Sequence, residues 1–475
     1  MTFAVRGVIE GFYGRPWSWA ERNSMVDFLG AHGYNMFAYA PKNDPIHRKR
    51  WHEPYLPVEL RRFSELMERC ARHGIEFVFG ISPMKFHYSD PAHFEQLWQK
   101  LAPMYAMGVR SFALLLDDMP DKFHHADDGD RFASIAHAQA WLNNALLARL
   151  QEAGGVHRLI FCPTEYCGEG VSPYLSTLGV ELAPEIDVFW TGTEVCAQFL
   201  KTEDARKINE TLRRQVLYWD NYPVNDGPMQ ERPHLRPIRG RDADLHTVCR
   251  GIVANASLQP EASKISLYTY GQFMLDPAGY DPEASWQEAL LTVTGNAADA
   301  AAVAVLGDLT RWSAVERGRS LYNQVTPELQ RFWQAWGGAP AAAGPDLPDL
   351  PPAPEPAPYD GGRLGAIERL EAVFAELGDA AAKLRGPMAN ARLQAELAPW
   401  TEKLDRWLKA LRAALATLRV SLTAPGTDLR PYEDATLDAF MAARESMYWV
   451  AGDLFDHFIR RCLWAAAECG GDARG

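Results

Sequence analysis

The feature that most constrains the fold is a regular alternation of short apolar runs with helical patterns, which begins at Val5 and ends near Ala256. Each apolar run has the length of one buried strand, and most of the intervening stretches carry helical periodicity. Eight such strand–helix units predict an α/β fold, a (β/α)8 TIM barrel. The apolar runs are residues 5–12, 35–41, 77–82, 112–118, 159–164, 187–192, 216–221 and 251–256. The clearest helical stretches are residues 17–31, 58–73, 91–107, 132–152 and 203–214.

Polar or aromatic residues follow almost every one of these apolar runs. The carboxyl ends of the parallel strands of such a barrel all meet at one rim, where its active sites are built. We therefore expect these strand ends to lie together. They carry Glu10 to Tyr13, Lys42, Asp117, Asp118, Thr164 to Tyr166, Trp190, Thr191, Trp219 to Asn221, Asp226 and Asn255.

The fourth run ends abruptly in two adjacent carboxylates, Asp117 and Asp118, followed by Pro120. Two like charges held this close do not both ionise easily, so the pKa of one of them is predicted to rise. A carboxyl group that stays protonated near neutral pH can act as a general acid.

The predicted rim combines aromatic rings with many short hydrogen-bonding side chains, which suits a carbohydrate, whose rings have apolar faces and many hydroxyls. Neither GxGxxG nor GxxxxGK[ST] occurs at a strand–helix junction, so no phosphate-containing cofactor is predicted. His124 and His125 lie in an acidic segment but without the regular spacing of metal ligands, which favours a solvated loop. The sequence thus predicts no cofactor and no metal.

Adjacent carboxylates cannot easily reach a glycosidic bond from opposite faces, as a pair in most glycosidases does. Asp117 and Asp118 can act from one side if the substrate supplies its own nucleophile. The carbonyl oxygen of a 2-acetamido group can attack the anomeric carbon while one Asp holds the amide N–H and the other protonates the leaving oxygen.

The barrel region resembles glycoside hydrolase family 84, the β-N-acetylglucosaminidases that include O-GlcNAcase. The resemblance covers nearly all of residues 1–276, whereas the helical tail resembles the accessory region of the family more loosely. Asn43 departs from the family motif, in which Asp is common at this position, and this puts the charge beside Lys42 in doubt. The motifs that carry the resemblance are Arg6–Trp17, Tyr39–Pro45, Leu116–Asp118, Cys162–Cys167, Trp190–Gly192 and Trp219–Asn221.

The resemblance implies a role for each of nine residues. Asp117 would orient the 2-acetamido group, Asp118 would be the general acid and then the base, and Tyr166 would donate to the acetamido oxygen. Trp219 would wall the acetyl pocket, above a Cys162 that only packs. The implied sugar ligands are Gly11, by its carbonyl group, Lys42, Asp226 and Asn255, with Asn221 near the catalytic acid.

The activity that the resemblance implies is a retaining exo-β-N-acetylglucosaminidase, working through an oxazoline intermediate. Its substrates would be β-GlcNAc glycosides and proteins or peptides that carry GlcNAc on Ser or Thr. Two alternatives stay open: a hexosaminidase for amino-sugar oligosaccharides, and a catalytically silent module that binds GlcNAc or a protein.

Beyond the barrel, the sequence predicts an all-α helical bundle region. Three long amphipathic helices are expected there, at residues 364–384, 391–418 and 432–467. They could cover the active-site groove, form a homodimer interface or bind another partner, because amphipathic periodicity is the same for all three. The predicted domains are a catalytic barrel (1–280), a helical extension (281–336), a Pro/Ala/Gly-rich linker (337–363) and the bundle (364–475).

The composition of the chain argues against some classes of binding partner and favours one cellular compartment. The net charge of −13 argues against nucleic acid and against an anionic membrane surface. The sequence contains no apolar run long enough to span a membrane, and its first residues read as a strand, not as a signal peptide. Seven scattered cysteines give no disulfide framework, so a reduced, cytoplasmic location is expected.

Overall fold

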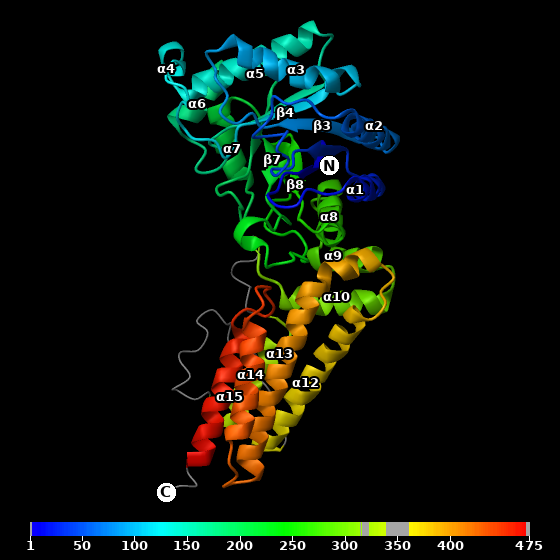
Figure 1. Cartoon of the computed structure of the whole chain (residues 1–475), viewed down its shortest axis with the longest axis vertical. Coiled ribbons are helices and arrows are strands. Elements are labelled where there is room, and N and C mark those ends of the chain that lie inside the picture. The colour runs from blue at the N-terminus through cyan, green and yellow to red at the C-terminus, as the bar shows by residue number, and fades with distance from the viewer. Residues whose placement is uncertain (1, 314, 316–322, 339–360, 472–475) are drawn as a thin grey trace. The chain divides into compact units, whose positions relative to one another are not determined.

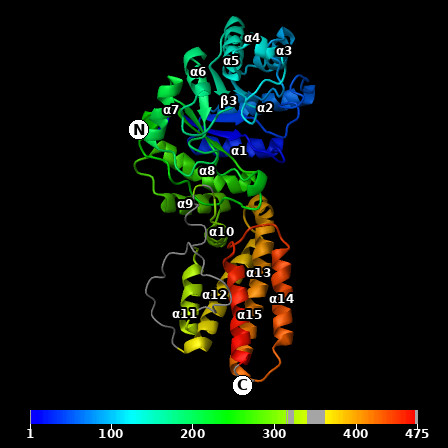
Figure 2. The ribbon, with the colours of Figure 1, turned by 90° about the vertical axis from the view of Figure 1, so that its left-hand side faces the viewer.

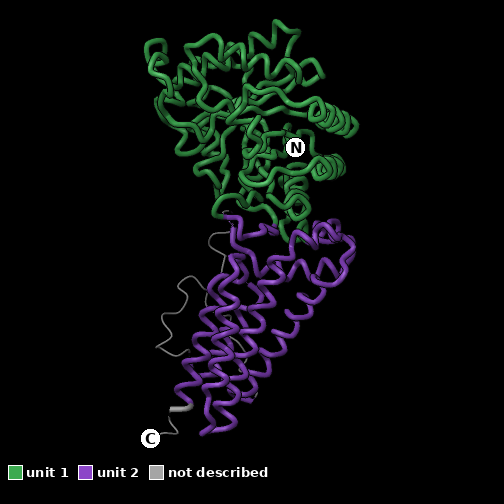
Figure 3. Tube along the Cα trace, in the orientation of Figure 1, with its two compact units in different colours: residues 1–228, 237–286 green, residues 229–236, 287–475 purple. Residues whose placement is uncertain are grey.

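The structure, a computed structural model, describes residues 2–313, 315, 323–338 and 361–471. The chain divides into two compact units (Figure 3). Unit 1 comprises Met1–Pro228 and Pro237–Trp286, and unit 2 comprises Met229–Arg236 and Gln287–Gly475.

Unit 1 is a closed barrel of eight strands, each hydrogen-bonded in parallel to its neighbours in chain order (Figure 1). The predicted (β/α)8 barrel is therefore confirmed. The strands are β1 (Val5–Glu10), β2 (Met36–Tyr39), β3 (Glu76–Ile81), β4 (Ser111–Leu115), β5 (Arg158–Cys162), β6 (Asp187–Trp190), β7 (Leu217–Asp220) and β8 (Gly251–Asn255).

The barrel closes where β8 pairs with β1, and a glycine makes this close approach possible. Gly251 lies opposite Val5 with φ +148°, and a Cβ atom there would stand 2.1 Å from the Val5 carbonyl oxygen. A larger residue at position 251 would push the first and last strands apart.

Helices cover the outside of the barrel, and short capping signals start them. The Ser18 hydroxyl accepts from the Glu21 N–H while the Glu21 carboxylate accepts from the Ser18 N–H, which is a capping box. The helices are α1 (Trp19–Ala31), α2 (Pro57–Arg72), α3 (Pro91–Ala106), α4 (Asp128–Arg131), α5 (Ile135–Glu152), α6 (Pro173–Glu181), α7 (Thr202–Leu212) and α8 (Pro260–Leu275).

Sequence periodicity missed α6, although Ser172 at its N-cap and Pro173 at its first position are strong helix-start signals. The connection from β7 to β8, which is described throughout, holds two short 3-10 turns and no α-helix. They are Gly227–Met229 and Leu245–Thr247.

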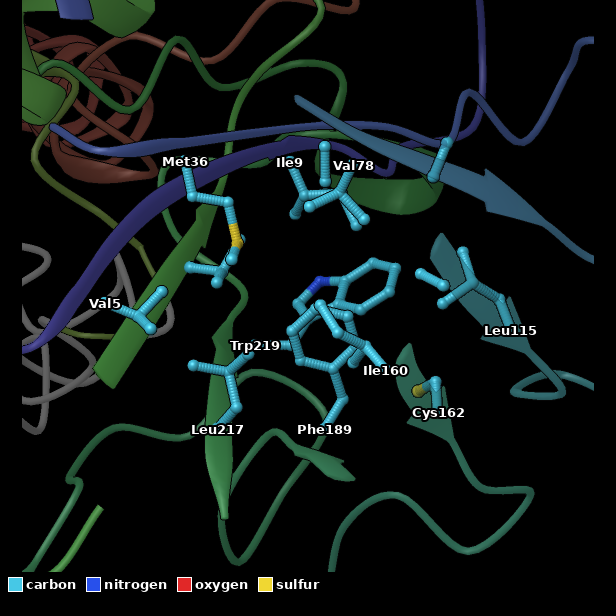
Figure 4. Packing of buried hydrophobic residues seen from close by; sticks show 14 residues of the cluster. Val5, Ile9, Met36, Val78, Leu115, Ile160, Cys162, Phe189, Leu217 and Trp219 are labelled. Carbon is cyan, nitrogen blue, oxygen red and sulfur yellow. The ribbon is translucent and has the colours of Figure 1, made fainter. Parts of the chain in front are cut away.

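Inward-facing side chains of all eight strands fill the barrel interior, as Figure 4 shows. The indole of Trp219 lies among them, with the Phe189 ring 5.3 Å away at 75° between ring planes. The other members are Val5, Ile9, Met36, Ala38, Ala40, Val78, Ala113, Leu115, Ile160, Cys162, Leu217 and Val253. The barrel is thus a packed core that fixes the positions of its strand ends.

Unit 2 is built from long helices that run side by side (Figures 1 and 2). A stripe of α13 side chains is buried against α12, α14 and α15, which confirms the predicted amphipathic pattern. The helices that follow the barrel are α9 (Pro282–Thr294), α10 (Ala297–Leu309), α11 (Thr326–Trp336), α12 (Gly362–Arg385), α13 (Ala391–Thr423), α14 (Arg430–Arg444) and α15 (Leu454–Gly471). The buried stripe is Leu393, Leu397, Trp400, Leu404, Trp407, Leu408 and Leu411.

The prediction of one continuous helix over 432–467 is wrong, because the chain leaves the helix between α14 and α15. Ala451 and Gly452 adopt positive φ values of 60° and 55°, which no α-helix accommodates. The backbone N–H of Trp449 bonds instead to the Glu231 carbonyl at 2.9 Å, and the Ala451 N–H bonds to the Leu309 carbonyl at 2.7 Å.

Most of the predicted linker, residues 339–360, lies outside the described residues. The four functional domains predicted from sequence stay a prediction. Among the described residues, no helix is both long and apolar enough to cross a membrane.

A buried ion pair fastens the loop after β1 to α1. Arg22 donates to both oxygens of Glu10, at 2.6 and 2.9 Å, while Glu10 also accepts from the Trp17 N–H at 2.9 Å. Burial raises the pKa of Glu10, although the Arg22 guanidinium opposes this rise. The pair fixes the path of the chain from Gly11 to Trp17.

We expect Arg22→Met to lower the free energy of unfolding by about 3–5 kcal/mol, because it leaves the Glu10 charge buried without its partner. The matched control is Arg62→Met, whose pair with Glu65 is exposed, and which should cost about 0.5 kcal/mol or less. Urea denaturation of the three proteins measures the difference. Equal losses in the two variants would contradict a role for the buried pair in stability.

Candidate active site

All nine residues singled out from the sequence lie at or just beyond the carboxyl ends of barrel strands. Because the strands are parallel, these ends share one rim of the barrel. Gly11 follows β1, Lys42 follows β2, Asp117 and Asp118 follow β4, and Tyr166 follows β5. Trp219 belongs to β7 and Asn255 to β8, with Asn221 and Asp226 in the connection between these two strands.

A buried lysine joins the two adjacent carboxylates. The Lys42 ammonium forms an ion pair with Oδ2 of Asp117 and lies 3.6 Å from Oδ2 of Asp118. Lys42 and Asp117 are each only 5% exposed. Burial disfavours the charge on Lys42, but the two carboxylates outweigh it, so its pKa is raised. One cation thus faces two neighbouring carboxylates at the rim and offsets the repulsion between them.

The second oxygen of Asp117 has a different environment. Oδ1 is buried and has no hydrogen-bond partner within the described part of the chain. An ionised carboxylate oxygen in such a place is a strong acceptor with a vacant valence, ready for an N–H group of a bound molecule.

Asp118 is held by two tyrosines. Its backbone has φ 54°, in the left-handed region, and its side chain is 32% exposed. The Tyr13 hydroxyl donates to Oδ2 at 2.8 Å and the Tyr166 hydroxyl donates to Oδ1 at 3.1 Å. The turn directs Asp118 into the open rim while Asp117 stays buried.

The predicted rise in pKa is not found at Asp118. Burial works toward a higher pKa, but the Lys42 charge and the hydrogen bonds from Tyr13 and Tyr166 outweigh it and lower the pKa of Asp118. The repulsion between neighbours can be read from the sequence, but the lysine and the two phenols reach the same carboxylate from other strands, and only the fold brings them there.

Two asparagines connect the ends of β7, β8 and β1. Oδ1 of Asn221 accepts from the Trp219 indole N–H and from the Asn255 amide, both at 2.9 Å. Oδ1 of Asn255 accepts from the Gly11 N–H at 3.1 Å, and the Asn221 amide donates to the Val195 carbonyl at 2.7 Å. The chain of bonds fixes the orientation of both amides.

The Trp219 ring lies in the barrel interior, next to the rim. It is 4% exposed and lies 5.4 Å from the Lys42 ammonium, at cation–π distance. Cys162 belongs to the same apolar cluster, and burial raises the pKa of its thiol well above the ordinary value. A thiol in this state packs and does not act as a nucleophile.

Asp226 is brought in from the long β7–β8 connection. Its Oδ2 accepts from the Tyr13 N–H at 2.7 Å, and burial raises its pKa. The neighbouring Asn225 is anchored, because it accepts from the Leu258 N–H at 3.0 Å and donates to Gln259 at 2.8 Å.

The structure also shows supporting residues that sequence analysis did not single out. Arg241 donates to both oxygens of Asp220, the residue before Asn221, at 2.6 and 2.8 Å, and both side chains are buried. The Thr164 hydroxyl donates to the Leu116 carbonyl at 2.9 Å, next to Asp117. Asp220 and Thr164 stand inside the recognised motifs, which could have indicated them, whereas no pattern pointed to Arg241.

No metal site appears in the part of the chain that the structure describes, where no three acidic, His or Cys side chains are grouped to hold an ion. The ring of His125 stacks on that of His87 with 4.1 Å between centroids, and His125 also lies 3.2 Å from the Lys85 carbonyl oxygen. The candidate cation loop is thus fixed by contacts within the protein.

Comparisons with known proteins agree with this geometry. The family model described as beta-N-acetylglucosaminidase matches residues 6–307. The Protein O-GlcNAcase of Rattus norvegicus is 36% identical over 270 residues, which are 55% of this chain and 29% of that protein. The chain thus spans less than a third of the length of that relative.

Solved structures extend the likeness to the helical region. A mutant of the O-GlcNAc hydrolase of Thermobaculum terrenum is 31% identical with a TM-score of 0.87, and the match covers 100% of this chain and 97% of that one. The structure of CpGH84B is 26% identical with a TM-score of 0.80, over 97% of this chain and 77% of that one.

Gly11 tests how closely the rim is packed. A Cβ atom at this position would stand 2.5 Å from Cζ2 of Trp219, so Gly11→Ala must displace the indole or the loop and should cost about 1–3 kcal/mol of unfolding free energy. Gly129→Ala is the control, because its Cβ would meet only ordinary contact at 3.8 Å. Urea denaturation and near-UV circular dichroism measure both. An unchanged tryptophan signal in Gly11→Ala would contradict the close packing.

Proposed function

Because the chain belongs to the β-N-acetylglucosaminidase family, we propose that it is a retaining exo-β-N-acetylglucosaminidase that removes O-linked GlcNAc from Ser and Thr of proteins. The observation that carries this proposal is the asymmetric pair at the rim. Asp117 offers one buried, vacant oxygen, and Asp118 projects beside it into the open site.

The first step uses the substrate as its own nucleophile. Oδ1 of Asp117 accepts the acetamido N–H, which increases the electron density on the acetamido carbonyl oxygen. That oxygen attacks the anomeric carbon, and the bond to the leaving oxygen breaks as Asp118 donates a proton to it. The product of this step is an oxazoline protonated on nitrogen (an oxazolinium ion), whose N–H stays hydrogen-bonded to Asp117, and the leaving group departs as an alcohol.

In the second step, Asp118 changes from a general acid to a general base. Asp118, now ionised, takes a proton from water, which attacks the anomeric carbon and opens the oxazoline. Two displacements at one carbon restore the original β configuration, so the enzyme retains stereochemistry. Tyr166 donates to the acetamido oxygen as the ring closes, a role that is supported by the bond between its hydroxyl and Asp118.

The remaining rim residues would bind the sugar. The Gly11 carbonyl, Lys42, Asp226 and Asn255 provide donors and acceptors for its hydroxyls, with Trp219 as the wall of the acetyl pocket. Lys42 also pairs with Asp117 and lies 3.6 Å from Asp118, so we assign it a second role in holding the two carboxylates together.

For the helical unit we infer a homodimer. Large apolar side chains are exposed on α14 and α15, where a groove of about 380 Å³ opens. A symmetric dimer buries one such patch against itself. The groove is lined by Leu437, Phe440, Arg460, Leu463 and Trp464. We also propose a cytoplasmic site of action, which is supported by six cysteines that form no disulfide in the structure: Cys70, Cys162, Cys167, Cys249, Cys462 and Cys469.

We expect Asp117→Ala and Asp118→Ala each to lower the turnover of a chromogenic β-GlcNAc glycoside by about 10²–10⁴-fold, because each removes a group that acts in the chemical step. Asp121→Ala, an exposed carboxylate in the same loop, should keep wild-type turnover. For the wild type, the rate should fall as fluorine atoms on the N-acyl group make its carbonyl less nucleophilic.

A hydrolysis rate that does not change with the nucleophilicity of the N-acyl carbonyl group would exclude the substrate-assisted mechanism. Binding without turnover in the folded wild type would favour the silent sugar- or protein-binding module. Cleavage of amino-sugar oligosaccharides, but not of GlcNAc-modified peptides, would favour the hexosaminidase.

The dimer predicts twice the chain mass in size-exclusion chromatography with light scattering. Trp464→Glu should yield monomers, because it places a charge in a desolvated apolar face. Val180→Glu, at an equally exposed apolar position on α6, should leave the mass unchanged. A monomeric wild type would rule out the dimer.

A further inference from the structure

Arg48 is a buried cation that lacks the partner such a group normally has. It is 7% exposed, and no carboxylate lies within ion-pair distance of it among the described residues. Its Nε is buried without a hydrogen-bond partner there, and its NH1 group donates to the Tyr13 hydroxyl at 2.9 Å. A buried guanidinium whose recorded bond goes to a phenol beside the proposed general acid calls for a functional explanation.

The direction of the Tyr13 hydroxyl follows from this contact. A guanidinium N–H can only donate, so the Tyr13 oxygen must accept from Arg48. The single hydroxyl proton of Tyr13 is then directed elsewhere, and its acceptor is Oδ2 of Asp118 at 2.8 Å. Arg48 thereby makes Tyr13 a donor to Asp118.

The two oxygens of Asp118 are consequently not equivalent. Oδ2 receives the Tyr13 proton and also faces the Lys42 ammonium at 3.6 Å. Among the described residues, Oδ1 receives only the Tyr166 hydroxyl, at the longer distance of 3.1 Å, and no donor there fixes the direction of that hydroxyl. A proton on Oδ2 would point at the Tyr13 hydroxyl proton, which is unfavourable. Oδ1 can take a proton as soon as the Tyr166 hydroxyl turns away from it.

We propose that Arg48 is a positioning residue that acts through the Tyr13 hydroxyl to reserve Oδ2 of Asp118 as an acceptor and to make Oδ1 the oxygen that carries the catalytic proton. The inference rests on the proposed function and deepens it. When a substrate draws the Tyr166 hydroxyl to its acetamido oxygen, Oδ1 loses its donor and takes up a proton from solvent, to which Asp118 is exposed. Substrate binding and protonation of the general acid thus occur together.

Other charged and titratable groups also act on Asp118, and the test must separate Arg48 from them. Those near it are Lys42 from the β2–α2 loop, Asp117 from the same turn, Cys162 and Tyr166 from the β5 end, and Asp226 from the β7–β8 connection. His47 acts on Lys42 and Arg48. Burial lowers the pKa of His47 to about 3, so it stays neutral over the working range. Removing Arg48 or the Tyr13 hydroxyl leaves all these groups in place.

The experiment is the pH profile of kcat/KM on an aryl β-GlcNAc glycoside, for wild type, Arg48→Met, Tyr13→Phe and the double variant. The basic limb reports loss of the proton from the general acid. Hydrogen bonds donated to a carboxylate favour its charged form. Removing the Tyr13 hydroxyl, or the Arg48 contact that directs its proton to Asp118, should therefore raise the pKa of Asp118 and move the basic limb about one pH unit upward.

Arg50→Met is the matched control, because Arg50 is on the same loop but is 53% exposed and pairs with Glu53. Its profile should coincide with that of the wild type. Tyr13→Phe removes one hydroxyl from a partly exposed ring, so it tests the relay even if Arg48→Met folds poorly.

The double variant decides whether Arg48 acts through Tyr13. If the basic limb of the pH profile moves no further in the double variant than in Tyr13→Phe, Arg48 acts through the Tyr13 hydroxyl. Equal, additive shifts would show that the Arg48 charge acts directly, and an unmoved limb with a uniformly lower kcat/KM would show a structural role; both results overturn the proposal. A wild type that does not hydrolyse β-GlcNAc at all would refute the proposed function, which is a separate outcome.

Discussion

The Lys42 ammonium between Asp117 and Asp118 is the interaction on which the rest of the site depends. Two carboxylates that are adjacent in sequence and partly desolvated would repel each other strongly, and at least one would protonate without a nearby cation. Lys42 removes this conflict by pairing with one and facing the other. It leaves Oδ1 of Asp117 vacant in a buried position, and it lets Asp118 project into the open rim. The position of Lys42 thus gives the two carboxylates different roles, Asp117 as a buried acceptor and Asp118 as an accessible acid.

The barrel keeps these groups in place with buried ion pairs at the last residues of two strands. Glu10–Arg22 holds the start of the loop that carries Gly11 and Tyr13, and Asp220–Arg241 holds the residue before Asn221. Both pairs are buried and bidentate, a geometry in which the charges are satisfied and the side chains cannot rotate. The packed interior around Trp219 completes this support, because a strand end can move only if the core below it moves.

Hydrogen-bond direction adds a level of order that distances alone do not express. Tyr13 stands between a group that can only donate and a carboxylate that can accept, so its proton has one place to go. Tyr166 has no such constraint recorded, and it is the phenol proposed to follow the substrate. A rigid donor on one oxygen and a movable donor on the other would allow a carboxylate to stay ionised in the empty enzyme and take up a proton in the complex.

Alternating strand and helix patterns determined the barrel, and the motifs at its strand ends indicated Asp117, Lys42 and Asn255, because parallel strands bring their carboxyl ends together whatever the loops do. The break between α14 and α15 could not be read from periodicity, since it depends on bonds from Trp449 and Ala451 to segments far away in sequence. The lowered pKa of Asp118 and the contact of Arg48 with Tyr13 were likewise decided only in the tertiary structure. Electrostatic effects and hydrogen-bond directions depend on which groups from separate strands come within a few ångströms, and a linear pattern does not contain that information.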